Sequence, residues 1–510
     1  MSRINTNVQS MVAQRVLGQN NFSLNKSLER LSTGLRINRG KDDPAGLIAS
    51  ENLRSEIKAT NAAISNATRA DQVVNTAEGG LQEISSLLTE LQGLVTTSSS
   101  SGGISQEEKE ANQLQIDSIL QTIDRIAGAT SFQGMKLLNG GFDYQVSSVN
   151  ASVTDYQVNG AKFEGASQDV DVLVTQSAQQ GVIFMSFGGT SLTFAGADEG
   201  NFTIEITGSR GSRELQFASG TTLSDMATAI NTFTDITGLV ASVASSGATT
   251  GIALYSQDFG SDEFARVKVV NDAGVQNGSS TLGFYNMESD DAGTIDTSSS
   301  TDFDATAATN GIRDAGQDVG AIINGIAATA KGKTININTD FLDVEMTLTT
   351  GASQALASID AFKITGGGAD FQLAGNVDIG GKVSVGISDV AVRKLGSSSL
   401  GFLDDLASGK SYNLVDDDGV QAQKIVSEAI GQVSSLRGRL GAFQTNVIGS
   451  TIRSLGIAVE NTAAAESVIR DADFATETAA LTRSQILSQA SQTVLSIANS
   501  QPQSVLQLLG

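Results

Sequence analysis

Residues 74–95 read VNTAEGGLQEISSLLTELQGLV, with apolar residues at alternating steps of three and four. Residues 426–447 read VSEAIGQVSSLRGRLGAFQTNV and repeat this spacing near the other end of the chain. These are the a and d positions of a heptad, and they predict two helices that pack along narrow stripes in a coiled-coil rod. The rod stripes comprise Val74, Ala77, Leu81, Ile84, Leu88, Leu91 and Val95, and Val426, Ala429, Val433, Leu436, Leu440, Phe443 and Val447.

The two chain ends carry further apolar stripes on segments of unusual polarity. Residues 4–14 and 484–510 contain no charged residue, and Ser, Asn and Gln lie opposite the apolar positions. A free surface helix normally has a charged outer face, so we expect these helices to be buried in an assembly of subunits. The predicted core-packing positions are Ile4, Val8, Met11, Leu17, Leu24, Leu28, Leu31 and Leu35, and Leu487, Ala490, Val494 and Ile497.

Because each stripe is too narrow to stand alone, we predict that the N-terminal and C-terminal helices pair with each other. Residues 1–41 hold seven basic residues and one acidic residue, whereas residues 455–510 hold two basic and five acidic residues. Opposite charges favour such pairing, although chance also produces asymmetries of this size. The alternative is a set of independent surface helices on globular domains.

The composition excludes several classes of function. The chain has no His and no Cys, which removes the commonest general base, the commonest zinc ligands and all disulfides. A net charge of −23 opposes binding to nucleic acid. No apolar run is long enough to span a membrane. The N-terminus lacks the apolar core of a signal peptide, so we expect export by a route other than general secretion.

Two short motifs resemble ligand sites only in part. Gly332-Lys333-Thr334 ends like a phosphate-binding loop, but Ala327 stands where that loop requires Gly, and a strand follows. Asp416-Asp417-Asp418 lacks the alternating ligands of a calcium loop and is interpreted as a turn. Nothing singles out a pair of carboxylates for glycoside hydrolysis. We predict no catalytic residue, no cofactor and no metal site, and therefore no enzyme.

The middle of the chain has a period of two and predicts strands. They are expected at residues 201–207, 214–217, 238–243, 265–270, 334–338 and 344–349, with one helix capped by Thr222. The polar residues 290–318 predict a loop or a boundary between two small subdomains. The fold class is thus α+β and multidomain, with a terminal α-helical coiled-coil rod formed by both chain ends and a β-rich central insertion.

Three domains follow from these patterns. Residues 1–44 and 455–510 form the terminal helical polymerisation core, and residues 45–170 and 400–454 form the helical rod, or outer tube. Residues 171–400 form the β-rich, surface-exposed insertion, which we expect to be split into two subdomains near residues 290–318.

Long motifs at both ends resemble bacterial flagellin. They are LERLSTGLRINRGKDDPAGLIASENL (28–53), NTAEGGLQEI (75–84), SFQGMKLLNG (131–140) and the whole stretch from residue 440 to residue 510. Residues 208–243 are similar to a β-rich hook-type insertion motif found in some longer flagellins.

The resemblance implies a structural subunit that polymerises with itself into the extracellular flagellar filament for swimming motility. It also implies type III export by the flagellum's own apparatus and, as partners, an export chaperone, the filament cap and hook-associated proteins. The alternative is a hook–filament junction protein, but those proteins usually match the C-terminal motif less fully, and DADFATETAALTRSQIL (471–487) is intact here. A metalloprotease insertion would need a zinc-binding His pair. An adhesive insertion and O-linked glycosylation remain open.

One departure concerns innate immunity. Flagellins detected by the vertebrate Toll-like receptor for flagellin carry an Arg where this chain has Glu90, within LLTELQGLV (87–95). A second basic position aligns with Ile119 and a Glu with Gln115, whereas Leu94 still matches. Reversing a charge at an interface anchor is costly, so the resemblance implies weak or absent receptor activation.

Overall fold

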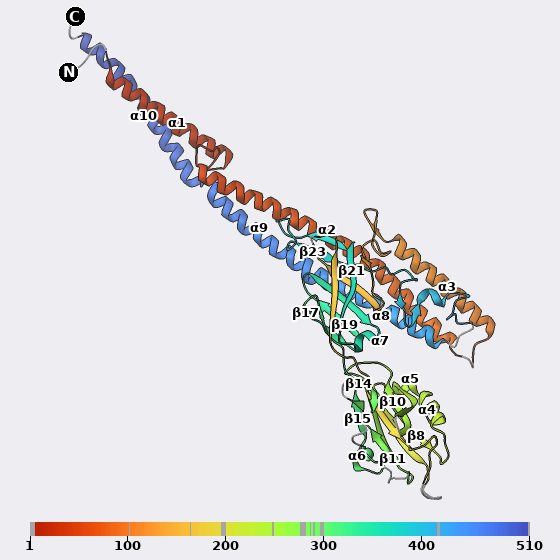
Figure 1. The fold of residues 1–510 in the computed structure, drawn as a ribbon. Helices are drawn as coiled ribbons and strands as arrows, with labels where there is room; N and C mark the ends of the chain where they lie inside the picture. The colour runs from red at the N-terminus through yellow and green to blue at the C-terminus, as the bar shows by residue number, and fades with distance from the viewer. Residues whose placement is uncertain are drawn as a thin grey trace. The chain divides into compact units, whose positions relative to one another are not determined.

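The computed structural model describes residues 6–507 except 101–102, 164, 195–199, 247–248, 276–281, 286, 289–290, 296–299 and 416–418. Helices fill both ends of the described chain and strands fill the middle (Figure 1), so the predicted α+β class is confirmed. The chain divides into two compact units. Unit 1 comprises residues 1–74, 371–382 and 441–510, and unit 2 comprises residues 75–370 and 383–440.

Unit 1 is built mainly from long helices whose ends are set by local signals. Asn7 accepts a hydrogen bond from the amide of Ser10 at 3.0 Å, and Gly34, with φ of 74°, ends the first helix in the left-handed conformation. Pro44 starts the second helix, where its missing N–H costs nothing. The elements are α1 (Val8–Thr33), the first part of α2 (Pro44–Ser98), the π-helical turn η2 (Phe443–Ile448), α9 (Gly449–Arg470) and α10 (Phe474–Gln507).

Unit 2 contains the rest of α2, α3 (Gln106–Ala129) and nearly all of α8 (Val420–Ala442). Ser105 and Glu108 form a capping box at the start of α3, and Arg437 of α8 pairs with Glu78 of α2 at 2.8 Å. The side-chain amide of Gln432 both accepts from and donates to the backbone of Gly396, at 3.0 and 2.7 Å. Short elements accompany these helices: β1 (Ser131–Phe132), β2 (Met135–Lys136), β24 (Gly396–Ser397), β25 (Gly401–Phe402) and η1 (Leu403–Leu406).

Two antiparallel sheets form a first β core in unit 2, around buried residues such as Val172, Val344 and Ile364. The five-stranded sheet has the order β17 (Ile326–Ala327), β16 (Gly320–Ile323), β5 (Gln168–Gln176), β21 (Ser358–Gly367) and β3 (Tyr144–Ser147). The four-stranded sheet has the order β18 (Thr329–Lys331), β19 (Thr334–Asn338), β20 (Leu342–Leu348) and β4 (Val153–Ala161). Ala352 of α7 (Thr350–Gln354) packs against this core. A separate two-stranded sheet is formed by β22 (Ala369–Gln372) and β23 (Lys382–Val385).

Two further antiparallel sheets and α4 (Leu223–Asn231) enclose a second β core, with Phe202, Met226 and Phe303 fully buried. One sheet has the order β12 (Gly283–Tyr285), β6 (Val182–Ser186), β10 (Thr249–Ser256) and β9 (Leu239–Ser246). The other has the order β15 (Ile312–Ala315), β11 (Phe264–Asn271), β7 (Phe202–Thr207) and β8 (Ser212–Phe217). The short elements here are α5 (Thr234–Thr237), α6 (Thr306–Asn310), β13 (Met287–Glu288) and β14 (Asp291–Ile295).

The predicted strands of the middle region are all present, and Thr222 caps α4 by accepting the amide of Asp225 at 3.2 Å. The limits of the β-rich region differ from those expected. Strands β3 and β4 precede residue 171, yet they belong to the same sheets as β20 and β21. The domain boundaries derived from the sequence therefore stand only as a proposal. The two sheets of the first β core begin at Tyr144 and not at residue 171.

The two β cores are nested rather than consecutive. The chain leaves the first core after β5 and returns to it at β16, so only the return crossing falls within residues 290–318. Gln179 and Gln317 exchange backbone hydrogen bonds of 2.8 and 2.9 Å where the crossings meet. A Cβ on Gly316 would lie 2.5 Å from the carbonyl oxygen of Gly260, so the close approach of these backbones requires glycine.

Asp318 connects the two β cores at this crossing through hydrogen bonds of its carboxylate. Its carboxylate accepts the amide and hydroxyl of Ser261, at 3.1 and 2.5 Å, and the amide of Gly332 at 2.6 Å. Burial alone would raise the pKa of Asp318, but these hydrogen bonds outweigh it and hold the pKa below its ordinary value. The stability that Asp318 contributes is therefore present at neutral pH and is lost as the pH falls through its lowered pKa.

We expect Asp318→Asn to lower the free energy of unfolding at neutral pH by about 1–3 kcal/mol, because the amide can no longer accept all three hydrogen bonds. Urea unfolding followed by circular dichroism measures the change. Asp304→Asn, at an exposed position beside the second core, is the matched control and should have little effect. The difference between Asp318→Asn and the natural chain should shrink below about pH 4, and a constant difference would contradict the assignment.

Candidate assembly site

Helices α1 and α10 lie side by side and antiparallel, so that the start of α1 is next to the end of α10 (Figure 1). We call their contact face the seam. Polar side chains cross it at hydrogen-bonding distances of 2.6–2.8 Å. The bonded partners are Asn7 with the Ala498 carbonyl, Ser10 with Asn499, Asn20 with Ser491, and Asn21 with Ser488.

The fully buried residues of the seam are not those of the expected stripes. The predicted pairing of the two terminal segments is present, but small residues rather than the apolar stripes are buried along it. Small side chains let the helix axes approach, and Ser and Asn hydroxyls and amides then find partners across the contact. The buried seam residues are Ser10, Ala13, Ser27, Ser488, Ser491 and Ala498.

The apolar stripes of both helices are left largely uncovered. Met11 is 63% exposed and Ile497 is 58% exposed, values unusual for such side chains on a helix. Val8, Leu28, Leu487, Ala490 and Val494 are also exposed, whereas Leu17, Leu24, Leu31 and Leu35 are half-buried. Ile4 lies outside the described residues.

A second contact joins the two ends where the helices are interrupted. We call residues 34–43 and 471–473 the elbow. The amide of Arg36 donates to the Arg470 carbonyl at 2.7 Å, and the amide of Ala472 donates to the Gly34 carbonyl at 2.9 Å. The guanidinium of Arg36 also donates to the Ile469 carbonyl at 2.6 Å. The backbone between α9 and α10 is therefore fixed by the turn that follows α1.

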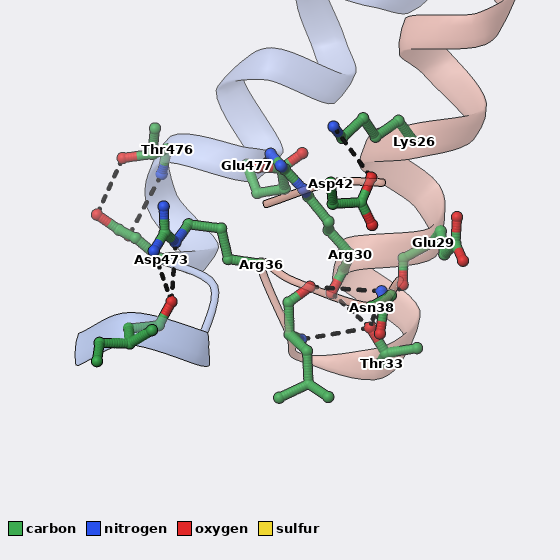
Figure 2. A network of polar contacts seen from close by, with 12 residues as sticks. Lys26, Glu29, Arg30, Thr33, Arg36, Asn38, Asp42, Asp473, Thr476 and Glu477 are labelled. Carbon is green, nitrogen blue, oxygen red and sulfur yellow. Dashed lines mark hydrogen bonds and ion pairs between the residues drawn. The ribbon is translucent and has the colours of Figure 1, made fainter. Parts of the chain in front are cut away.

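Ion pairs surround the elbow (Figure 2). Arg30 of α1 lies 3.5 Å from Glu477 of α10, and Lys26 lies 3.3 Å from Asp42. Glu477 is only 9% exposed, and it is the one charged residue among the buried residues of the described chain. The opposite charges predicted for the two ends therefore meet here.

Asp473 caps the start of α10. Its carboxylate accepts the hydroxyl of Thr476 at 2.9 Å and the amide of Ala475 at 2.9 Å. These bonds, that of the Thr476 hydroxyl foremost, hold the pKa of Asp473 below its ordinary value. The cap is therefore intact at neutral pH and weakens as the pH falls through that pKa.

The rod stripes lie on buried faces of α2 and α8. All seven positions on α2, from Val74 to Val95, are at most 1% exposed, and those on α8, from Val426 to Leu440, are at most 3% exposed. Phe443 is 9% exposed. Val447 is only half-buried, and its neighbour Ile448 is fully buried instead. Burial agrees with the stripes up to Phe443, while their role in a coiled-coil rod stays a prediction.

The residues aligned with the receptor-binding surface lie on α2 and α3. Glu90 and Gln115 are exposed and joined by a hydrogen bond of 3.1 Å from the Gln115 amide to the Glu90 carboxylate. Leu94 is half-buried. Ile119 is buried at 6% exposure and so presents almost no surface to a partner.

The described residues show no cluster of three or more acidic side chains that could hold a metal ion. Gly332, with φ of 62°, forms the turn between β18 and β19, which is a hairpin and not a phosphate-binding loop. Asp416, Asp417 and Asp418 lie outside the described residues. None of the described helices carries an apolar run sufficient for a bilayer crossing.

Sequence reasoning missed the seam face and the elbow contacts. The small residues of the seam were visible as Ser and Ala among the stripe positions, but an amphipathic pattern marks the large apolar residues as the contact. The elbow hydrogen bonds are accepted by backbone carbonyls, which every residue has, so the sequence does not indicate them. Only the charge asymmetry between the two ends indicated the Arg30–Glu477 pair.

Three family models match the chain. The bacterial flagellin N-terminal helical region matches residues 4–143, the bacterial flagellin C-terminal helical region matches residues 423–509, and the flagellin hook IN motif matches residues 201–254. Similar curated proteins include the B-type flagellin of Pseudomonas aeruginosa, at 30% identity, and flagellins of Salmonella choleraesuis and Vibrio cholerae, each at 28% identity. Each alignment covers 99% of this chain and 99% of the relative.

We expect Glu477→Gln to loosen the contact between the two chain ends, because Arg30 keeps its charge while its partner loses one. An ion pair that keeps some contact with solvent contributes about 0.2–1 kcal/mol, so the free energy of local opening at the start of α10 should fall by about that amount. Amide hydrogen exchange measures this quantity. Glu460→Gln, at an exposed position of α9, is the control. Equal exchange in both variants would show that the ion pair contributes nothing.

Proposed function

This chain belongs to the bacterial flagellin family, whose members are structural subunits of the flagellar filament and not enzymes, and we propose that it polymerises into the filament that a cell rotates to swim. We prefer this to a role at the hook–filament junction. The observation that carries the proposal is the unpaired apolar stripe on each of the two terminal helices.

A chain that pairs its terminal helices through small polar residues leaves the opposite faces to be covered by other molecules. Fully burying a Val, Leu, Ile or Met side chain stabilises an assembly by roughly 1.5–3 kcal/mol. Association costs roughly 4–15 kcal/mol in lost freedom. The eleven exposed or half-buried stripe positions of the terminal segments named above are therefore enough to offset the cost of adding a subunit.

We infer that the covering molecules are other copies of this chain. The stripes carry no charge over residues 8–14 and 484–501, so stacking them against each other leaves no buried unpaired charge. A head-to-tail contact that does not close on itself produces a helical polymer. The terminal helices would then form its core, residues 45–170 and 400–454 an outer tube, and residues 171–400 a surface-exposed insertion.

The proposed function also implies where the protein acts and which proteins it contacts. We propose that the chain leaves the cell through the flagellar export apparatus and acts in the extracellular filament. Its partners would be an export chaperone that covers the exposed stripes before assembly, the filament cap and the hook-associated proteins. No cofactor is required for any of these steps.

We expect the double substitution Val494→Ser, Ile497→Ser to abolish filament growth, because it removes two exposed apolar side chains without touching the seam. Monomer is mixed with short filament seeds or a precipitating salt and examined by electron microscopy. The control is Gln492→Ser, Ser496→Ala, at exposed polar positions of the same helix. Unfolding curves should be alike for all three proteins, and long filaments from the double Ser variant would contradict the role of the stripe.

The same experiment separates the two candidate functions. Long tubular filaments grown by the natural chain on its own seeds support the filament subunit. Failure of the natural chain to extend these seeds, while it still binds to the ends of filaments from another flagellin, would favour the junction protein.

We also expect weak or no activation of the vertebrate Toll-like receptor for flagellin, because Glu90 replaces a basic anchor. The double variant Glu90→Arg, Gln115→Glu reverses both ends of an existing contact between α2 and α3 and should gain activity by at least tenfold in a reporter-cell assay. Glu83→Arg, at another exposed site on α2, is the control. A response of the natural chain at nanomolar concentration would refute the prediction.

A further inference from the structure

Helix α8 continues into α9 through the π-helical turn η2 (Phe443–Ile448). The amide of Gly449 donates to the carbonyl of Gln444, five residues earlier, where an α-helix would bond four residues earlier. A π-turn is equivalent to one extra residue inserted in an α-helix, and such turns are found mostly at functional positions. The described part of the chain has no other π-helical turn.

The extra residue changes which side chain is buried. Along the stripe the buried residues are Leu440, then Phe443, then Ile448, so the last step is five. The heptad spacing of the sequence requires a step of four and would bury Val447. In the structure Val447 is half-buried and Ile448 is fully buried. The π-turn therefore lets Ile448 take the place that the repeat assigns to Val447.

Side-chain hydrogen bonds accompany the π-turn. The hydroxyl of Ser450 donates to the carbonyls of Asn446 and Val447. Within unit 1, the amide of Gln444 donates to the carboxylate of Asp71 on α2 at 2.8 Å. These contacts are exposed or partly exposed, so water can replace them at small cost.

We propose that residues 443–448 have two packed states: the π-turn with Ile448 buried, and an uninterrupted α-helix with Val447 buried. Val447 and Ile448 are both β-branched and apolar, so either side chain can fill the buried position that follows Phe443 on the stripe. Each residue of an α-helix advances by ~100°, so the exchange changes which residues of α9 lie on the same face as Phe443. The helix is thus a two-state element built into the chain, independent of whether the subunit forms a filament or a junction.

The first test deletes one residue. Removing exposed Asn446 turns the step from Phe443 to Ile448 into four, which an α-helix satisfies with every other stripe residue in place. The midpoint of thermal unfolding should stay unchanged or rise. Removing exposed Ser435 from the middle of α8 is the matched control, and it should lower the midpoint sharply because every later stripe residue leaves its face. Equal damage from both deletions would overturn the proposal.

The second test observes the exchange itself in the full-length monomer, with methyl groups of Val and Ile labelled for NMR. Relaxation dispersion should appear at both Val447 and Ile448 in the natural chain, on the microsecond-to-millisecond scale, and should vanish when Asn446 is deleted. In Ile448→Ser the Val447 methyls should become protected from a soluble paramagnetic probe. Absence of dispersion in the natural chain, together with an unprotected Val447 in Ile448→Ser, would overturn the two-state element. If Ile448→Ser does not fold, the dispersion comparison between the natural chain and the deletion still decides.

Discussion

The constraint on which the ends of this chain depend is that α1 and α10 can each cover only one face of the other. They use the small, polar face for this, with Ser10, Ser488 and Ser491 buried in the seam. Ordering a backbone costs about 1–2 kcal/mol per residue, whereas a neutral hydrogen bond returns a net 0.5–1.5 kcal/mol. Because few side-chain bonds cross the seam relative to the length of the helices, the pair is weakly stabilised until its outer faces are covered. Assembly and helix order are therefore coupled.

The elbow matters because it sets where each terminal helix starts and stops. Gly34 ends α1 and Asp473 caps α10. Backbone hydrogen bonds from Arg36 to Arg470 and from Ala472 to Gly34 hold these two ends together. The ion pairs of the chain ends concentrate here, whereas residues 4–14 and 484–510 carry no charge. A charge inside the uncharged segments would have to be desolvated on assembly, whereas at the elbow Arg30 and Glu477 satisfy each other within one chain.

Sequence periodicity identified the helices and the rod stripes because burial on one helix face leaves a repeat of three and four. The prediction that Val447 is buried was not met, because the spacing of apolar residues does not indicate where a π-turn adds one residue to a helix. Periodicity also missed strand β6, whose five residues VIFMS are all buried. Ile183 and Met185 belong to one cluster and Phe184 to another, so both faces of β6 are covered and no polar alternation remains. The nesting of the two β cores depends on contacts between residues more than a hundred positions apart, which spacing along the chain does not encode.

The two parts of the chain therefore face different physical demands. Most large apolar residues of the insertion are buried in its own cores. Hydrogen bonds of Asp318 and backbone pairing of Gln179 with Gln317 hold the crossing between the two β cores. These cores are formed by contacts within one chain and do not require a neighbouring subunit. Each residue of α1 and α10, by contrast, must suit either a close seam or a surface that another molecule will cover. A substitution in the insertion is thus limited by one folded core, whereas a substitution in the terminal helices must satisfy two packings at once, within the chain and between chains.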